Sequence, residues 1–266
     1  MSAKAYPPTR LRPVLSKNRI ALGRVIAAFF AERRGEFAEV ITRRVGLEKM
    51  NDPAKRAGDA VDDLIIDWGA LATAAEPYIA AVVVAGGQLA LEEISETAFE
   101  TFGDGMRVRA AEYATRRAAE MVGMRYEGSI LVPNPNAKWR IDEATRDMLR
   151  SEVEAAIKDG DSAQELARRI EDSHAFSKAR AKTIARTEIA KSDSEGALIG
   201  WKSTGLVNGK SWLPDSDPCP TCQGYAALGP VPLDHDYGNG VQAAPAHPNC
   251  ECTMLPEFME ELELHQ

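Results

Sequence analysis

The chain has 266 residues, enough for one large or two small domains with hydrophobic cores. Hydrophobic residues make up 44% and charged residues 27%, the composition of an ordinary soluble globular protein rather than of a compositionally biased class. Aromatic residues are few and alanine is abundant, which favours helix over sheet.

The net charge of −8 is unevenly distributed. Residues 1–50 carry eleven Lys and Arg against four Glu, a net charge of +7, so the remainder carries −15. A basic N-terminal segment can meet nucleic acid or an acidic partner surface. A solvated helix face explains the same charges equally well.

No segment reads as a membrane or export signal. The N-terminus is basic but lacks the apolar stretch of a secretory signal. The most apolar run, over residues 78–94, is interrupted by Gly86 and Gly87 and reaches Glu92 too soon to span a bilayer. We therefore expect a protein made in a cytoplasm, where thiols stay reduced.

The first half of the chain is predicted to be helical. Residues 1–16 form an extended basic arm in this prediction, and apolar residues then recur every three or four positions over 17–45, as in an amphipathic helix. Asn51 or Asp52 caps a second helix that has Pro53 in its first turn. Further helices are expected over 77–98 and 105–124.

A second helical stretch follows the prolines near residue 133, the best candidate for a domain boundary. One helix ends at Gly160, and Asp161 or Ser162 caps the next. A third runs from about Ser177 to Thr204 and is stopped by Gly205.

The composition and pattern of the sequence change after Gly205. An Asn-Gly turn at 208–209 precedes a strand-like "KSWL", which predicts a small hairpin leading into a loop with all four cysteines. Proline and glycine are frequent up to Pro256, and periodic apolar residues are few. We therefore expect this segment to have little hydrophobic core of its own and to need a cross-link that holds it folded.

These elements define the expected fold. It is mainly α, a helical N-terminal region followed by an α+β C-terminal domain with a small hairpin and a zinc-stapled loop. The expected domains are the arm at 1–16, a helical domain at 17–132, a C-terminal domain at 133–256 whose Cys/His loop spans 212–253, and an acidic tail at 257–266.

The cysteines form two half-sites. Cys219 and Cys222 are separated by two residues, and His247, Cys250 and Cys252 follow after a loop. Zinc takes four soft or borderline ligands in a tetrahedron, and paired half-sites are how short sequences supply them. The sequence predicts a zinc site with five candidate ligands for four positions and does not decide which one is spare.

Other chemistries for the cluster are weaker. The alternatives are a disulfide or redox role and a reduced cluster without metal. A thioredoxin-like role needs Cys-x-x-Cys at a strand-to-helix turn in a βαβ unit, which Pro220 and the loop-rich context do not supply. "PCPTC" matches half of the nucleobase-deaminase signature, but His174 is followed by Ala175 and Phe176, so the H-x-E half is missing. His235, flanked by aspartates, is more typical of a solvated loop histidine than of a catalytic base. We expect a structural metal, no catalytic residue and no enzyme.

The segment from about residue 140 to 256 resembles the phage Mu F-like minor head proteins, or phage head morphogenesis family. The resemblance rests on Arg186-Thr187-Glu188, on the "G-K-x-W" strand ending at Trp212, and on the order of the Cys and His residues through "HPNCEC". One departure is Glu251, where the family usually has a basic residue.

The resemblance implies a minor capsid protein that acts in assembly of a tailed-phage head and is located in the virion after assembly in the host cytoplasm. Its implied partners are the portal protein or the major capsid protein, with packaged DNA as a further partner of the basic N-terminal segment. A zinc-dependent enzyme or nucleic-acid-modifying effector carried in the particle is the alternative.

The Arg186-Thr187-Glu188 triplet has a plain interpretation. Residues two apart on a helix do not share a face, so Arg186 and Glu188 are expected to have separate partners that hold the small domain together. An interaction surface is the next alternative, and a catalytic role for Glu188, as in ADP-ribosyl transfer, lacks accompanying nucleotide-binding residues.

Overall fold

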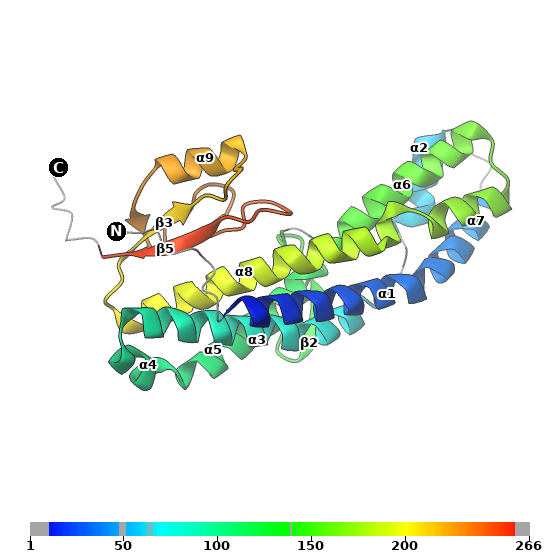
Figure 1. Ribbon diagram of the computed structural model, residues 1–266. Coiled ribbons are helices and arrows are strands. Elements are labelled where there is room, and N and C mark those ends of the chain that lie inside the picture. The colour runs from blue at the N-terminus through cyan, green and yellow to red at the C-terminus, as the bar shows by residue number, and fades with distance from the viewer. Residues whose placement is uncertain (1–10, 48–51, 63, 65, 139, 259–266) are drawn as a thin grey trace. The chain divides into compact units, whose positions relative to one another are not determined.

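The computed structural model describes residues 11–47, 52–62, 64, 66–138 and 140–258 (Figure 1). The described chain is mainly helical, with short antiparallel strands and a Cys/His cluster near its C-terminal end, so the predicted fold class is confirmed. Residues 1–10 of the predicted arm and 259–266 of the acidic tail lie outside the described residues.

Two compact units interleave along the chain. One combines the residues up to Ala21 with Pro77–Ala114 and the part from Thr183 onward, and the other combines Leu22–Glu76 with Thr115–Lys182. Four helices therefore contribute residues to both units. The expected domain boundary near residue 133 stays a prediction.

The first helix, α1 (Arg12–Leu47), begins five residues earlier than predicted. Residues 12–16 are helical rather than extended, because Pro13 lies in the first turn, where a missing backbone N–H costs nothing. The predicted apolar periodicity is confirmed further along, where several side chains are at most 3% exposed: Leu22, Ile26, Phe30, Phe37 and Ile41.

The second helix, α2 (Pro53–Val61), is capped by Asp52, whose carboxylate accepts from the backbone N–H groups of Ala54 and Lys55. It ends at Val61, well before the next helix, α3 (Trp68–Ile94). The reason is tertiary: Arg146 donates to the carbonyls of Val61, Asp62 and Leu64. These bonds satisfy carbonyls that a longer helix would have used.

Helix α3 passes through Gly86 and Gly87 without interruption, in agreement with the helix predicted over 77–98. By length and composition alone it is the one described helix that can cross a membrane, and a single such helix is weak evidence of membrane insertion. Helices α4 (Glu96–Phe102) and α5 (Gly105–Met121) follow it.

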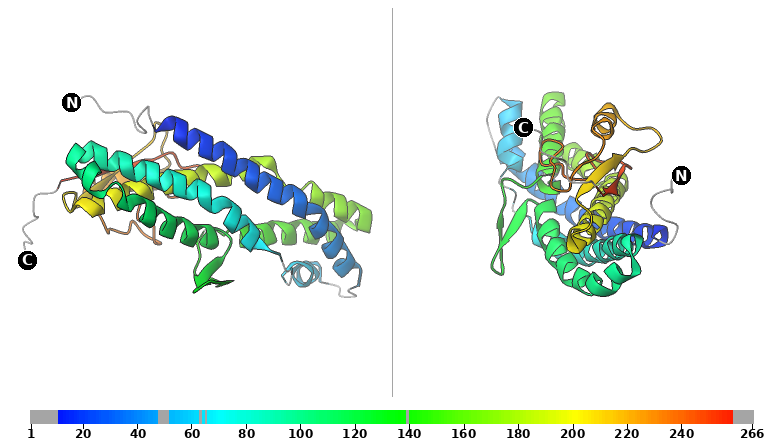
Figure 2. Two further views of the ribbon diagram at one scale, coloured as in Figure 1. Left: turned by 90° about the horizontal axis from the view of Figure 1, so that it is seen from below. Right: turned by 90° about the vertical axis from the view of Figure 1, so that its left-hand side faces the viewer.

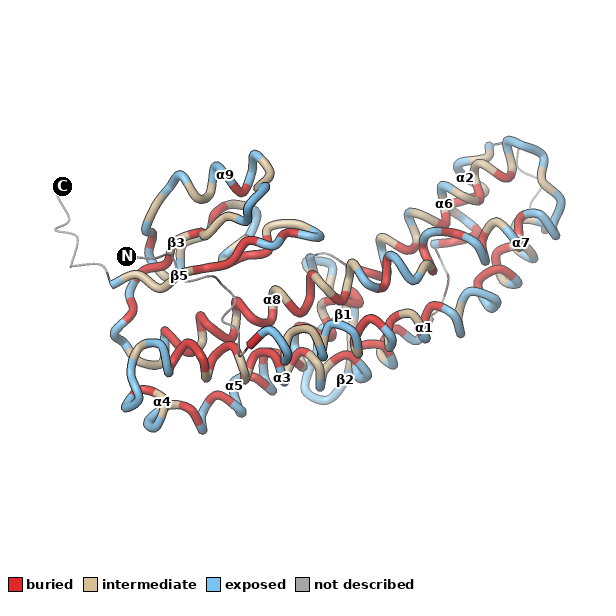
Figure 3. Tube along the Cα trace, viewed as in Figure 1, coloured by how far each residue is buried: buried red, intermediate tan, exposed pale blue. Residues whose placement is uncertain are grey.

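Small residues bring α3 close to α8 (Lys178–Thr204). A Cβ atom on Gly196 would lie 2.4 Å from the carbonyl oxygen of Val83, and one on Gly200 would lie 2.8 Å from the carbonyl oxygen of Gly87. Only glycine permits backbones to approach this closely. Buried residues line the facing sides of both helices (Figure 3).

A hairpin that the sequence analysis missed follows α5. Strand β1 (Met124–Glu127) pairs antiparallel with β2 (Ile130–Pro133), and Gly128 has the positive φ of the turn between them (Figure 2). Each strand has four residues, too few for a clear alternation of apolar and polar side chains.

The remaining helices of the second unit are close to prediction. Helix α6 (Ile141–Asp159) ends at Gly160 in the left-handed region, and α7 (Ala163–Glu171) has Ser162 as N-cap in a full capping box. A short 3₁₀ helix, η1 (His174–Phe176), follows. The buried Arg180 donates to the carbonyls of Ala175 and Ile141 and joins these elements.

The C-terminal part contains a three-stranded sheet of order β4-β3-β5. Central strand β3 (Gly209–Leu213) pairs antiparallel with β4 (Val231–Pro232) and with β5 (Thr253–Glu257). The strand at "KSWL" is confirmed, but Gly209 is its first residue rather than part of a turn, and its partners come from far along the chain.

An aromatic core lies in this part of the chain, which corrects the expectation that it has little core of its own. The rings of Trp212, Tyr225 and Tyr237 contact each other with centroids 5.0–5.1 Å apart. Trp201 of α8 and Met254 of β5 are buried in the same cluster. Few aromatic residues suffice because each buries a large apolar area.

Candidate metal centre

The first half-site is held at the start of a short helix. In α9 (Pro220–Ala227), Cys219 is the N-cap residue and Pro220 occupies the first helical position. Cys222 lies in the first turn and is 1% exposed. Residues three apart share a helix face, so this turn directs both sulfur atoms to one side.

The second half-site is a tight turn before β5. The backbone N–H of Cys250 donates to the carbonyl of His247, and Asn249 has a φ of 62°, a left-handed conformation that asparagine tolerates. Cys250 and Cys252 are both buried. The turn brings the second set of candidate ligands next to α9.

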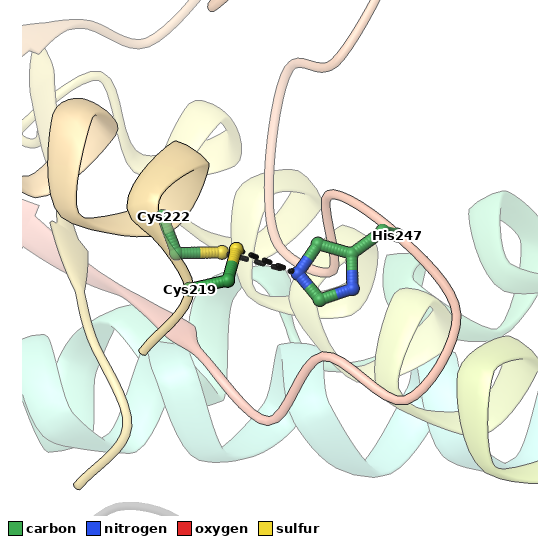
Figure 4. Close-up of side chains that lie close together, drawn as sticks. All are labelled: Cys219, Cys222 and His247. Atoms are coloured by element: carbon green, nitrogen blue, oxygen red, sulfur yellow. Dashed lines mark hydrogen bonds between the residues drawn. The ribbon is translucent and has the colours of Figure 1, made fainter. Parts of the chain in front are cut away.

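The five predicted residues come together in two overlapping groups. Cys219, Cys222 and His247 form one group, and Cys222, Cys250 and Cys252 form the other; within each group all ligand atoms lie within 4.8 Å of one another. Figure 4 shows His247 directed at the two sulfurs of α9. This arrangement can hold a metal ion.

The distances match the edges of a zinc tetrahedron. Bond lengths of about 2.3 Å to sulfur and 2.0–2.1 Å to nitrogen imply edges of about 3.8 Å between sulfurs and 3.6 Å between nitrogen and sulfur. The Sγ atoms of Cys222 and Cys250 are 3.7 Å apart, and His247 Nε2 lies 3.5 Å from Cys222 Sγ and 3.2 Å from Cys219 Sγ. The donor set therefore fits zinc in size and chemistry.

The tautomer of His247 suits a ligand. Its Nδ1 lies 2.9 Å from the carbonyl oxygen of Pro248. A carbonyl only accepts, so Nδ1 carries the proton and Nε2 presents its lone pair to the cysteine sulfurs. Such a bond from the second ring nitrogen is what orients metal-binding histidines.

The cysteines differ in their surroundings. The backbone N–H of Cys222, near the start of α9, lowers the pKa of Cys219 to about 7. Burial raises the pKa of both Cys222 and Cys250. Because metal ligation requires thiolates, the buried thiols need a cation that compensates for their desolvation.

Lys210 organises the loop between the two half-sites, and the sequence analysis did not identify this role. Its side chain is fully buried, and its Nζ donates to the carbonyls of Leu233, His235 and Gln242 over distances of 2.6–3.0 Å. Burial lowers the pKa of Lys210 to about 8. The available signal was a lysine inside the predicted strand "KSWL", two residues before Trp212.

The Arg186-Thr187-Glu188 triplet contacts the second half-site directly. Arg186 forms an ion pair with Glu251. The backbone N–H of Asn249 donates to the hydroxyl of Thr187, 3.3 Å away. Glu188 is buried. Glu251, the departure from the family pattern, is therefore one half of an ion pair that joins the turn of the second half-site to α8.

His235 is not one of the candidate metal ligands. Among the described residues it is in neither Cys/His group, and its ring packs against the edge of Tyr237, with centroids 4.9 Å apart. A histidine in this position supports the aromatic core of the C-terminal part.

Paired Cys/His half-sites on a small sheet and a short helix define the class of this region: a small α+β module built around a candidate metal centre. Residues 147–255 match the family model described as "Phage Mu protein F like protein". No curated protein and no solved structure matches the chain. The resemblance to the Mu F-like head proteins is therefore confirmed over residues 147–255, which include every candidate ligand.

Proposed function

We propose that this protein acts in assembly of a phage head as a minor capsid component, with a structural zinc ion in its C-terminal module. The family match over residues 147–255 carries the proposal, because a phage head role is what that family implies. The proposed location is the virion, with the portal or major capsid protein as partner.

The proposed zinc ligands come from Cys219, Cys222, His247, Cys250 and Cys252. A bound zinc ion supplies four strong bonds that join α9 to the turn before β5. Burial of Cys222 and Cys250 and the excess of ligands favour a closed, structural coordination shell over an open catalytic one.

The zinc site and the head-assembly role are tested separately, by metal content and by portal binding. Protein purified without added metal is expected to contain one zinc per chain by mass spectrometry, and Cys222→Ser is expected to lose it. Zinc-free, folded wild-type protein contradicts the metal assignment.

Co-expression with the portal protein of the same phage, followed by affinity capture, tests the assembly role. We expect the two proteins to co-purify at a constant ratio, whereas the major capsid protein captured alone points to an attachment elsewhere in the head. Capture of neither head protein contradicts the assembly proposal.

A further inference from the structure

The β1–β2 hairpin has an exposed edge along β1. Arg125, Tyr126 and Glu127 of β1 are all exposed. Leu131 of β2 is half-buried and packs at the start of α3, where a Cβ atom on Gly69 would lie 3.2 Å from its side chain. Figure 2 shows the hairpin projecting from the end of α5. Within the described part of the chain this sheet has two strands, fewer than an independently stable sheet needs.

The hydrogen-bond pattern of the hairpin shows which backbone groups of β1 are directed outward. The N–H of Asn134 donates to the carbonyl of Gly123 over 2.8 Å, so these two residues form a hydrogen-bonded pair. Hydrogen-bonded and non-hydrogen-bonded pairs alternate along an antiparallel ladder. Tyr126, three residues beyond Gly123 and opposite Leu131, is therefore in a non-hydrogen-bonded pair. Its N–H and C=O point away from β2, toward the position of a further strand.

The outer edge of β2 is less suited to a further strand. By the same alternation, Leu131 and Pro133 are the residues of β2 whose backbone faces away from β1. Proline has no N–H, so one of these two positions cannot donate to a neighbouring strand. A strand that extends the sheet is therefore expected on the β1 edge.

We propose that β1 pairs antiparallel with β1 of a second copy of this chain, with Tyr126 opposite the partner's Tyr126. The two tyrosines then exchange both of their backbone hydrogen bonds across a two-fold axis, and the two hairpins form one four-stranded sheet. This inference depends neither on a bound metal nor on the head-assembly role.

The charges of β1 favour a second copy as the partner and fix the register. Arg125 and Glu127 are two residues apart, share one face of the strand and form an ion pair. With the axis at Tyr126, each Arg125 is directly opposite the partner's Glu127, an arrangement that stabilises a sheet. A shift of the axis to Arg125 or to Glu127 also pairs outward backbone groups, but it places two like charges opposite each other. The strand is therefore complementary to itself in the register centred on Tyr126.

Sedimentation of the full chain over a range of concentrations tests the proposal. Each copy contributes one short strand, so we expect a weak dimer whose population rises with protein concentration. Arg125→Glu and Glu127→Arg each create like-charge pairs at two symmetric positions, and each is expected to raise the dissociation constant about tenfold. An equimolar mixture of these two variants again places opposite charges across the axis and is expected to associate like wild type.

Arg107→Glu is the matched control, because it makes the same charge change at an exposed position of α5; its dissociation constant is expected to equal that of wild type. A thermal melt of each variant verifies folding. The ion pair within β1 is lost in both variants, so recovery in the mixture reports pairing between copies. The proposal is overturned if wild type is monomeric at every concentration, if either single variant dimerises as tightly as wild type, or if the mixture stays monomeric.

Discussion

Lys210 illustrates how a single buried charge can order a loop that lacks regular structure. Its three backbone acceptors all lie between the two metal half-sites, and its Nζ lies 5.6 Å from the centre of the Tyr237 ring. A buried ammonium is stable only when its donors are all used. Lys210 therefore holds three carbonyls of this loop around one positive charge, as a bound metal cation does in other protein loops.

Lys210→Met is therefore expected to destabilise the protein by about 3 kcal/mol, because three buried carbonyls lose their donor while the side-chain volume is kept. Urea unfolding followed by tryptophan fluorescence measures the loss. Lys202→Met, at an exposed position of α8, is the control and should change stability by less than about 0.5 kcal/mol. Equal effects at both positions contradict the anchoring role.

At the scale of elements, the contact between α3 and α8 depends on glycine. Gly196→Ala would place a methyl group 2.4 Å from the Val83 carbonyl, so one helix has to shift. We expect a loss of about 2 kcal/mol in the free energy of unfolding, typical of overpacking.

Gly35→Ala makes the matched comparison. No atom lies within 4 Å of a Cβ at Gly35, which is inside α1. There the helix propensity of alanine should raise stability by about 0.5 to 1 kcal/mol. Thermal unfolding of the two variants should therefore shift in opposite directions, and a shift in the same direction refutes the packing argument.

Helix α9 and the sheet have different sources of stability. Strands β3 and β5 share five backbone pairs and the aromatic core, whereas α9 is short and carries the first half-site. If the site holds zinc as proposed, its chelation is expected to speed amide hydrogen exchange in α9 and in residues 243–252 while β3 and β5 stay protected. Exchange that rises equally in all of these elements would show that the metal holds the entire module.

At the scale of the molecule, residues 12–47 of the basic N-terminal segment form a helix that is part of the folded structure. Helix α1 has fully buried residues such as Leu22, Ile26 and Ile41, so deletion of residues 1–50 would remove core side chains along with charge. Substitutions at exposed arginines separate the two effects.

Combined Arg24→Gln, Arg34→Gln and Arg43→Gln changes tests the DNA contact, since all three arginines are exposed on α1. If this helix binds packaged DNA, log affinity falls with log salt concentration, and the three substitutions should make the absolute slope of this fall smaller by about 2 to 3. An unchanged slope in a fluorescence anisotropy titration assigns these charges to a solvated face.

Local rules account for the parts of this fold that the sequence predicts well. Ser162 and Gly160 act within a few residues of their positions, so their helix ends follow from capping chemistry alone. The end of α2 does not, because it depends on Arg146, more than 80 residues away. The same holds for Thr187, whose hydroxyl meets Asn249 only in the folded chain.

Sequence by itself determined the helical class, the strand at Lys210–Leu213, the five candidate metal ligands and the resemblance to a phage head family, since each depends on short-range spacing. Only the tertiary structure decided that the half-sites meet, that Lys210 is a buried anchor and that Arg186 pairs with Glu251. These contacts join segments from 23 to 65 residues apart, and no local pattern encodes which distant groups a folded backbone will bring together.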